Sequence, residues 1–208
     1  ALSSAASDVY KRQNLAYLRP NYAKVVADLC KEQGGMPFLT DCNTLYPGSR
    51  KNALEHLTCA QLNGFWPMTT GCQVLIADGL RGTDEVEVPV PNGEYCKTAK
   101  IGRAIMDADI FISLSHFKGH ESTGFGGAIK NIGMGCGSRA GKMEQHASGH
   151  PAIQEDLCRG CHRCAKECGS DAIRYNEKNK AVIDQDKCKG CGRCIGACNF
   201  DAIYSQCD

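Results

Sequence analysis

The chain lacks an excess of charge of either sign. Its 208 residues hold 24 lysines and arginines against 23 aspartates and glutamates, which gives a formal net charge of +1. Nucleic acids and anionic membrane surfaces attract proteins with a clear positive excess. We therefore expect no nucleic acid and no membrane surface among the partners of this protein. The hydrophobic fraction of 42% is that of an ordinary globular chain.

Long hydrophobic runs are also absent, because glycine, proline or a charged residue interrupts every apolar stretch. A membrane-spanning helix needs about 20 consecutive, mostly apolar residues. We therefore expect a soluble protein and place it in the cytoplasm. Two phosphate-binding motifs are missing as well. GSRAGK has one residue too few for a Walker loop, and no G-x-G-x-x-G sequence follows a predicted strand.

Cysteine, in contrast, is abundant: the chain has 15, and they must serve disulfides, zinc or iron–sulfur clusters. Seven of them have irregular spacings, which fits reduced thiols in a cytosol better than a secreted disulfide framework. These seven are Cys30, Cys42, Cys59, Cys72, Cys96, Cys136 and Cys207.

The other eight cysteines form an internal repeat. CRGCHRCAKECGSDAI begins at Cys158, and CKGCGRCIGACNFDAI begins 30 residues later at Cys188. Each copy has the spacing C-x2-C-x2-C-x3-C, in which three thiolates surround one iron–sulfur cluster and the fourth binds the other. We therefore predict two [4Fe-4S] clusters. Their ligands would be Cys158, Cys161, Cys164 and Cys198 for the first, and Cys188, Cys191, Cys194 and Cys168 for the second.

Zinc is the alternative metal, because pairs of C-x2-C also bind zinc. A third cysteine at the same interval favours iron–sulfur clusters instead. Gly160 and Gly190 let each loop turn closely around a cluster. The module resembles bacterial-type two-cluster ferredoxins over about fifty residues, except that Gly169 and Asn199 replace the proline that usually follows the fourth cysteine. The clusters could serve only as staples for a small domain, but two adjacent clusters favour electron transfer.

Upstream of the repeat, predicted helices and strands alternate. Short apolar strands are expected at Met36 to Thr40, Val74 to Ala77 and Asp109 to Leu114, with helices beginning near Pro20, Ser49 and Ala99. Glu85 to Val90 is expected to be an edge strand or a hairpin arm. Continuously apolar strands separated by helices indicate a parallel sheet. We therefore predict a Rossmann-like, mostly parallel α/β domain over residues 14–150, followed by a small α+β ferredoxin-like domain over residues 151–208.

Residues 1 to 13 are set aside as a tail without a packing partner. The stretch from Ser3 to Gln13, SSAASDVYKRQ, resembles the translated sequence of a sequencing adapter. A natural tail is the alternative. If the adapter interpretation holds, native sequence begins near Asn14, and the α/β domain lacks its first strand.

A glycine-rich segment, Leu114 to Lys142, contains many reactive side chains. Open α/β sheets bind ligands beyond the carboxyl ends of their strands. We therefore predict one pocket there, formed by His116, His120 and Lys130 near Asp41 and Asp78. The histidines would serve as acid, base or metal ligand, and Lys118 and Lys130 would hold an anionic group, with Gly126 and Gly127 letting the backbone approach it. The alternatives are hydrogen-bonded loop histidines, solvated lysines at 130 and 142, and aspartates that cap turns.

Three stretches carry a resemblance to a known family: FLTDCNTLYPGSRKNALEH, VLIADG and LSHFKGHESTGFGGAIKNIGMGC. They resemble the iron–sulfur centre proteins of domain-of-unknown-function family 362, from about Asn14 to the end of the chain. The resemblance implies an α/β domain before two clusters and implies no reaction. The spacing of His116, Gly119, Gly124, Gly126, Gly127 and Lys130 is also similar to a glycine–lysine segment of nickel-pincer lactate racemases, which implies a pocket.

The sequence thus predicts an oxidoreductase or electron-transfer protein. Its clusters would exchange electrons with a small-molecule substrate or a redox partner protein at the α/β domain. The alternative is a non-catalytic electron carrier, or a cluster-bearing interaction module. Convergence of the polar side chains in one deep pocket would favour the enzyme, and scattered side chains would favour the carrier.

Overall fold

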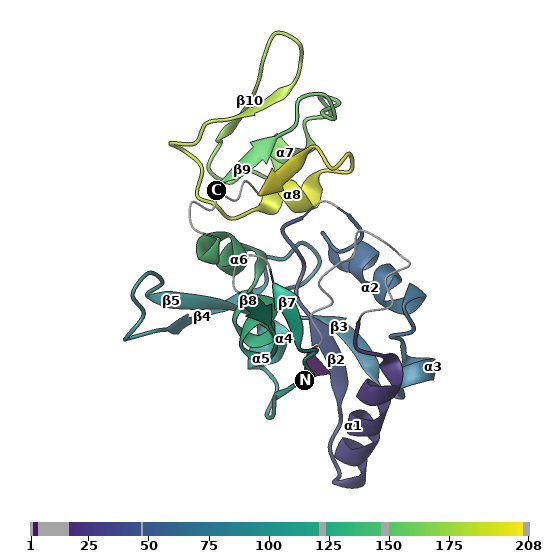
Figure 1. Cartoon of the computed structure of the whole chain (residues 1–208). Coiled ribbons are helices and arrows are strands. Elements are labelled where there is room, and N and C mark those ends of the chain that lie inside the picture. The colour runs from purple at the N-terminus through teal and green to yellow at the C-terminus, as the bar shows by residue number, and fades with distance from the viewer. Residues whose placement is uncertain (1, 4–16, 47, 121–123, 147–149, 206–208) are drawn as a thin grey trace.

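The computed structural model describes residues 2–3, 17–46, 48–120, 124–146 and 150–205. A four-stranded parallel sheet forms the centre of the first part (Figure 1). Its strand order is β3-β2-β1-β6, with Leu39 of the second strand opposite Val74 of its neighbour. The strands are β1 (Leu2–Ser3), β2 (Phe38–Asp41), β3 (Gln73–Ile76) and β6 (Ile112–Ser113).

Three of these strands lie where apolar runs predicted them, and they pair in the predicted parallel direction. The described residues do not form an extended Rossmann-like sheet, however, because β1 and β6 are only two residues long. The core on α1 is also small: Ala23 and Ala27 pack against Leu39, with Val74 and Ile112 partly buried beside them. Mixed helices and strands with small sheets describe the architecture.

The position of β1 differs from the expectation for the N-terminus. Leu2 pairs with Leu39 on one side and Ile112 on the other, so the place expected for a missing first strand is filled by residues that were set aside as a tail. Backbone pairing between strands depends little on side-chain identity, which is why sequence pattern did not indicate it. Residues 4–13 lie outside the described residues.

The helices of this part begin where local signals place them, with two corrections. Pro20 opens the first helix, as predicted. The second begins at Ala53, because the Asn52 side chain accepts a hydrogen bond from Glu55 N at 3.0 Å, whereas Ser49 was expected as the cap. The helices are α1 (Pro20–Glu32), α2 (Ala53–Leu62), α3 (Pro67–Thr70), α4 (Arg103–Met106), α5 (Ala128–Lys130), the π-helix η1 (Asn131–Gly135) and α6 (Arg139–Gln145).

The second correction concerns the helix expected from Ala99. Residues Thr98–Gly102 form β5 instead, which pairs antiparallel with β4 (Glu85–Pro89) and leaves only α4 helical. β4 is therefore a hairpin arm, as one of the two predictions for it stated. The glycine-rich segment adds a second small hairpin, β7 (Lys118–His120) with β8 (Gly124–Gly126).

The C-terminal part repeats one pattern twice. Each copy has a short helix that contains its third cysteine and a strand after the Asp-Ala pair: α7 (Arg163–Lys166) and β10 (Ile173–Tyr175), then α8 (Arg193–Ala197) and β12 (Ile203–Ser205). β10 pairs with β11 (Ala181–Ile183), and β12 pairs with β9 (Pro151–Ile153), both antiparallel. This internal symmetry is the one that the sequence repeat predicted.

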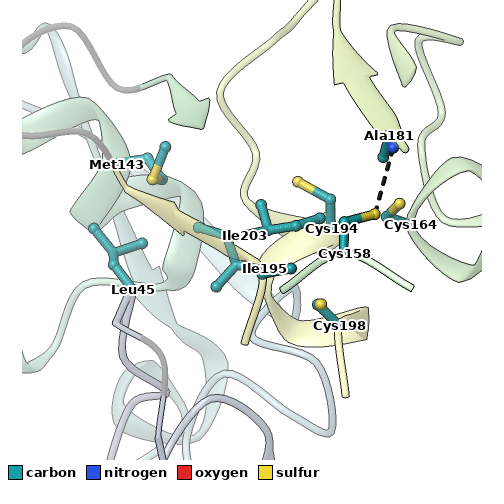
Figure 2. Close-up of a cluster of buried hydrophobic side chains, with 10 residues drawn as sticks. Leu45, Met143, Cys158, Cys164, Ala181, Cys194, Ile195, Cys198 and Ile203 are labelled. Carbon is teal, nitrogen blue, oxygen red and sulfur yellow. Dashed lines mark hydrogen bonds between the residues drawn. The ribbon is translucent and has the colours of Figure 1, made fainter. Parts of the chain in front are cut away.

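The two parts of the chain share a hydrophobic core. Leu45 and Met143 from the first part pack with Ile195 and Ile203 from the second, and Figure 2 shows these four side chains facing one another. Among the described residues, no helix has the length and apolar character needed to cross a membrane.

Candidate metal centre

Two cysteine loops of the same shape present the thiols. Gly160 and Gly190 both have a positive φ, of 61° and 64°. A Cβ on Gly160 would lie 2.2 Å from the backbone oxygen of Asn179, so only glycine fits there. The two loops are therefore built alike, as their spacing predicted.

The fourth cysteine of each copy lies beside the other copy. Cys198 is buried in one hydrophobic cluster with Cys158 and Cys164, and Cys194 of the second loop belongs to the same cluster (Figure 2). Burial first, and then the neighbouring Cys198 and Cys158 thiols, raise the pKa of Cys164. The structure thus brings together three of the thiols assigned to the first site, which consists of Cys158, Cys161, Cys164 and Cys198.

The same crossing is seen among the thiols that the spacing assigns to the second site, namely Cys188, Cys191, Cys194 and Cys168. The pKa of Cys188 is raised by burial first and then by the nearby Cys191 and Cys168 thiols, against the hydrogen bond from the backbone of Gly190. Burial, followed by Cys191 and Cys188, also raises the pKa of Cys194. Cys168 of the first copy therefore lies beside the loop of the second.

Hydrogen-bond donors point at several of these sulfurs. Ala181 N donates to Cys158 Sγ at 3.4 Å, and Ala172 N donates to Cys168 Sγ at 3.3 Å. The hydroxyl of Tyr175 lies 3.2 Å from Cys164 Sγ. Such donors stabilise thiolates and tune a cluster. Sequence reasoning missed Tyr175 and Ala181, because their approach depends on how β10 and β11 fold over the first loop.

The donor set fits [4Fe-4S] clusters. Both sites offer four thiols, and the loops that carry them turn tightly with backbone amides nearby. In the described part of the chain, no three His, Cys, Asp or Glu side chains are close enough to bind a single metal ion. A cubane takes one thiolate on each of its four irons, so its ligands stand farther apart than the ligands of one ion.

Beside the sheet lies a second set of functional groups, here called the buried polar group: Asp41, Asn43, His56, Asp78 and Lys142. As predicted, Asp41 and Asp78 follow neighbouring parallel strands and lie close enough for each to influence the other. Asp78 is 0% exposed and accepts hydrogen bonds from Asn43 N at 2.9 Å and Asn43 Nδ2 at 2.8 Å. Asp41 Oδ2 lies 3.8 Å from His56 Nε2.

Lys142 brings a buried positive charge to this group. Its Nζ donates to Gly137 O at 2.6 Å, and only 8% of the residue is exposed, which corrects the alternative of a solvated surface lysine. Burial raises the pKa of both Asp41 and Asp78, whereas Lys142 lowers it. The pKa of His56 is well below its usual value, chiefly because of burial and then because of nearby cations. His56 is therefore neutral at pH 7.

Three buried atoms in this group have no hydrogen-bond partner within the described residues. They are Asn43 Oδ1, His56 Nδ1 and Asp78 Oδ2. Buried polar atoms are usually satisfied, and those that protein groups leave open are completed by water or a ligand. Asn43 and His56 were not among the predicted site residues, since only the fold brings them to the two aspartates.

The residues predicted from the glycine-rich segment have different surroundings. The side chain of His116 is exposed, and Lys130 is half-buried at the end of α5. Lys118 and His120 lie in β7, and their side chains fall outside the described structure. Gly126 ends β8, and Gly127 precedes α5, whose three residues provide few aligned peptide dipoles for an anion. A single pocket formed by His116, His120, Lys130 and the two aspartates stays a prediction.

The fold and the cysteine sites define the class: this is an iron–sulfur electron-transfer protein that binds a [4Fe-4S] cluster. A family model described as a 4Fe-4S binding domain matches residues 181–204, which include Cys188, Cys191, Cys194 and Cys198. A second family model, described as a domain of unknown function (DUF362), matches residues 8–189. The chain therefore belongs to the DUF362 family, as the resemblance indicated. That match also includes residues 8–13, which were set aside as a tail. No curated protein matches the chain.

Proposed function

We propose that the chain carries two [4Fe-4S] clusters and passes electrons through them between a redox partner protein and the α/β part. The observation that carries this proposal is the exchange of the fourth cysteine between the copies. The Cys198 thiol is close enough to influence Cys164, and the Cys168 thiol is close enough to influence Cys188. A single-cluster protein has no need for a second, reciprocal set of thiols.

The first copy supports a second cluster as strongly as the copy that the 4Fe-4S family model matches. It has the same cysteine spacing. It also has the same unusual backbone: positive φ occurs at His162 and Gly192, and again at Asp171 and Asp201. A non-glycine residue with positive φ is uncommon, so its recurrence at equivalent positions indicates that both loops wrap the same kind of group.

Each cluster, when bound, supplies one-electron chemistry, and the chain's own residues determine where the electron enters and leaves. Cys161 is exposed, with Arg159, Arg163 and Lys166 exposed beside it, so a redox partner has access to the first site. The described cysteines form no disulfide bonds, which supports a reducing cytoplasm as the location.

We place the other end of the electron path at the buried polar group. Its unsatisfied atoms on Asn43, His56 and Asp78 supply places for a small polar molecule or for water to bind. His116 and His120 as acid, base or metal ligand, and Lys118 and Lys130 as holders of an anionic group, remain part of this proposal. The substrate would be a small molecule that accepts or gives electrons together with protons.

Anaerobic reconstitution of the full chain tests the proposal. We expect about eight iron and eight sulfide per chain, and visible absorption that bleaches on reduction. About four iron per chain would show that the protein binds only one cluster, and a colourless zinc protein would refute the cluster assignment.

The enzyme and the carrier are separated by two variants, His116→Ala and Lys130→Ala. We expect each to weaken binding of any small molecule that co-purifies anaerobically with the wild-type chain, while leaving both cluster spectra unchanged. Absence of any such molecule, or binding that neither variant alters, would favour the non-catalytic carrier.

A further inference from the structure

Three of the positions at which the two copies of the cysteine motif differ lie on one face of their short helices. His162, Ala165 and Lys166 in the first copy correspond to Gly192, Ile195 and Gly196 in the second. His162 and Lys166 are exposed, and the His162 ring stacks on Tyr175 with centroids 3.7 Å apart. In the second copy the large polar side chains are gone, and a large apolar one has appeared between them.

These differences mark the surface where the α/β part packs. Ile195 is 1% exposed, in the shared core with Leu45 and Met143 (Figure 2). A Cβ on Gly192 would lie 2.8 Å from Cδ of Arg139, and one on Gly196 would lie 3.2 Å from its Nη2. The two glycines thus give the Arg139 side chain room to lie against α8, the helix that carries Cys194.

Arg139 is held rigidly in this place. It is 0% exposed, and its guanidinium donates to three backbone carbonyls from separate segments: Thr44 O at 2.9 Å, Arg81 O at 3.2 Å and Lys51 O. An arginine stays protonated in proteins, and its planar fork suits several fixed acceptors. Burial lowers the pKa of Arg139, and the nearby Asp78, Cys194 and Cys191 raise it.

We propose that Arg139 is a positioning residue that decides which of the two clusters has the higher reduction potential. It fixes the second site against the α/β part and holds a positive charge beside it, so that the cluster of the second site has the higher reduction potential. This inference rests on the proposed two-cluster function. An electron would arrive at the first site, next to exposed Cys161, and pass to the second site. From there it would reach the buried polar group, which includes Asp78.

The physical reason is the charge change on reduction. Each cluster gains one negative charge when it takes an electron, and charge and burial set its potential. A cation within the protein interior is screened far less than an exposed one. Arg159, Arg163 and Lys166 around the first loop are exposed, so water weakens their effect. Arg139 therefore distinguishes two sites whose thiol ligands are the same.

The test is an anaerobic redox titration of the reconstituted full chain, followed by EPR spectroscopy. We expect Arg139→Met to lower one of the two potentials and to leave the other in place, and Arg139→Lys to restore most of the shift because it keeps the charge. The same Arg139→Met change should still shift the remaining potential when Cys161→Ser disables the first site. It should shift none when Cys191→Ser disables the second.

Two smaller changes, which leave Arg139 in the protein, test the proposal even if the Arg139 variants do not fold. Gly196→Ala pushes the guanidinium outward without removing it, and should shift the same potential in the same direction. Lys166→Ala, at the equivalent position of the first copy, should leave both potentials in place. Equal shifts of both potentials, or none in a folded protein with about eight iron, would overturn the proposal. A wild-type chain with only four iron would instead refute the two-cluster function.

Discussion

At the scale of single residues, small local features decide what each cysteine does. Cys198 and Cys168 each belong to the same short motif as the three cysteines that precede them, yet each lies beside the opposite copy. The spacing predicted this crossing. It did not predict the donors Ala181 N and the Tyr175 hydroxyl, because these approach the sulfurs from strands that fold over the loop.

The crossing leads to the first prediction. Cys198→Ala should remove the cluster bound by Cys158, Cys161 and Cys164, and Cys168→Ala should remove the other, so that iron content falls by about half in either case. EPR spectra of the two variants should be complementary. Cys30→Ala, in α1, is the control and should retain full iron. Loss of the same signal in both variants would show that the fourth cysteines do not cross.

The second prediction concerns the hydroxyl of Tyr175, which lies 3.2 Å from Cys164 Sγ. Tyr175→Phe keeps the ring that stacks on His162 and removes the donor. Hydrogen bonds to cluster sulfurs favour the more negative, reduced state. We therefore expect a lower potential for the first cluster at unchanged iron content, measured by redox titration. A shift of the second cluster instead would contradict the geometry.

At the scale of secondary-structure elements, one close backbone approach accompanies the place where the helix prediction failed. Residues from Ala99 looked helical, but Thr98–Gly102 pair with β4. Gly102 then lies tightly against the end of the sheet: a Cβ there would be 2.7 Å from Cys42 Sγ and 2.9 Å from Ala77 Cβ. This contact joins β5 to β2 and β3, and only a residue without a side chain permits it.

The third prediction follows from that contact. Gly102→Ala should destabilise the protein by about 1–3 kcal/mol, the usual effect of overpacking a filled core. Gly133→Ala is a matched control, because a Cβ at that position meets no atom within 4 Å. Thermal unfolding should show a lower midpoint for the first variant only. Equal midpoints would mean that the end of the sheet has room to adjust.

At the scale of the whole molecule, one core and one arginine join the two parts. Leu45 and Met143 pack with Ile195 across the boundary, and the Lys51–Asp201 and Arg81–Glu167 ion pairs flank this contact. These two pairs are partly exposed, so they add little to stability. The apolar packing and the buried Arg139 are the stabilising contacts between the parts.

The fourth prediction is that Ile195→Ala costs about 2–5 kcal/mol, since it leaves a cavity in the shared core. Because both parts line this cavity, we expect both to unfold at a lower temperature, followed by circular dichroism for the helices and by visible absorption for the clusters. Val182→Ala, at a half-exposed side chain on β11, should change little. An effect limited to the cluster absorption would indicate that the parts unfold independently.

The sequence by itself determined the repeat and its symmetry, the places of three short strands and the parallel direction of their sheet. These depend on spacing and on local apolar runs, which a sequence displays directly. Tertiary structure alone decided that Lys142 and Arg139 are buried, that His56 and Asn43 join Asp41 and Asp78, and that the second copy faces the α/β part. Burial of a charge depends on countercharges and carbonyls brought from distant segments, such as Asp78, Thr44 and Lys51 around Arg139, and no local pattern contains that information.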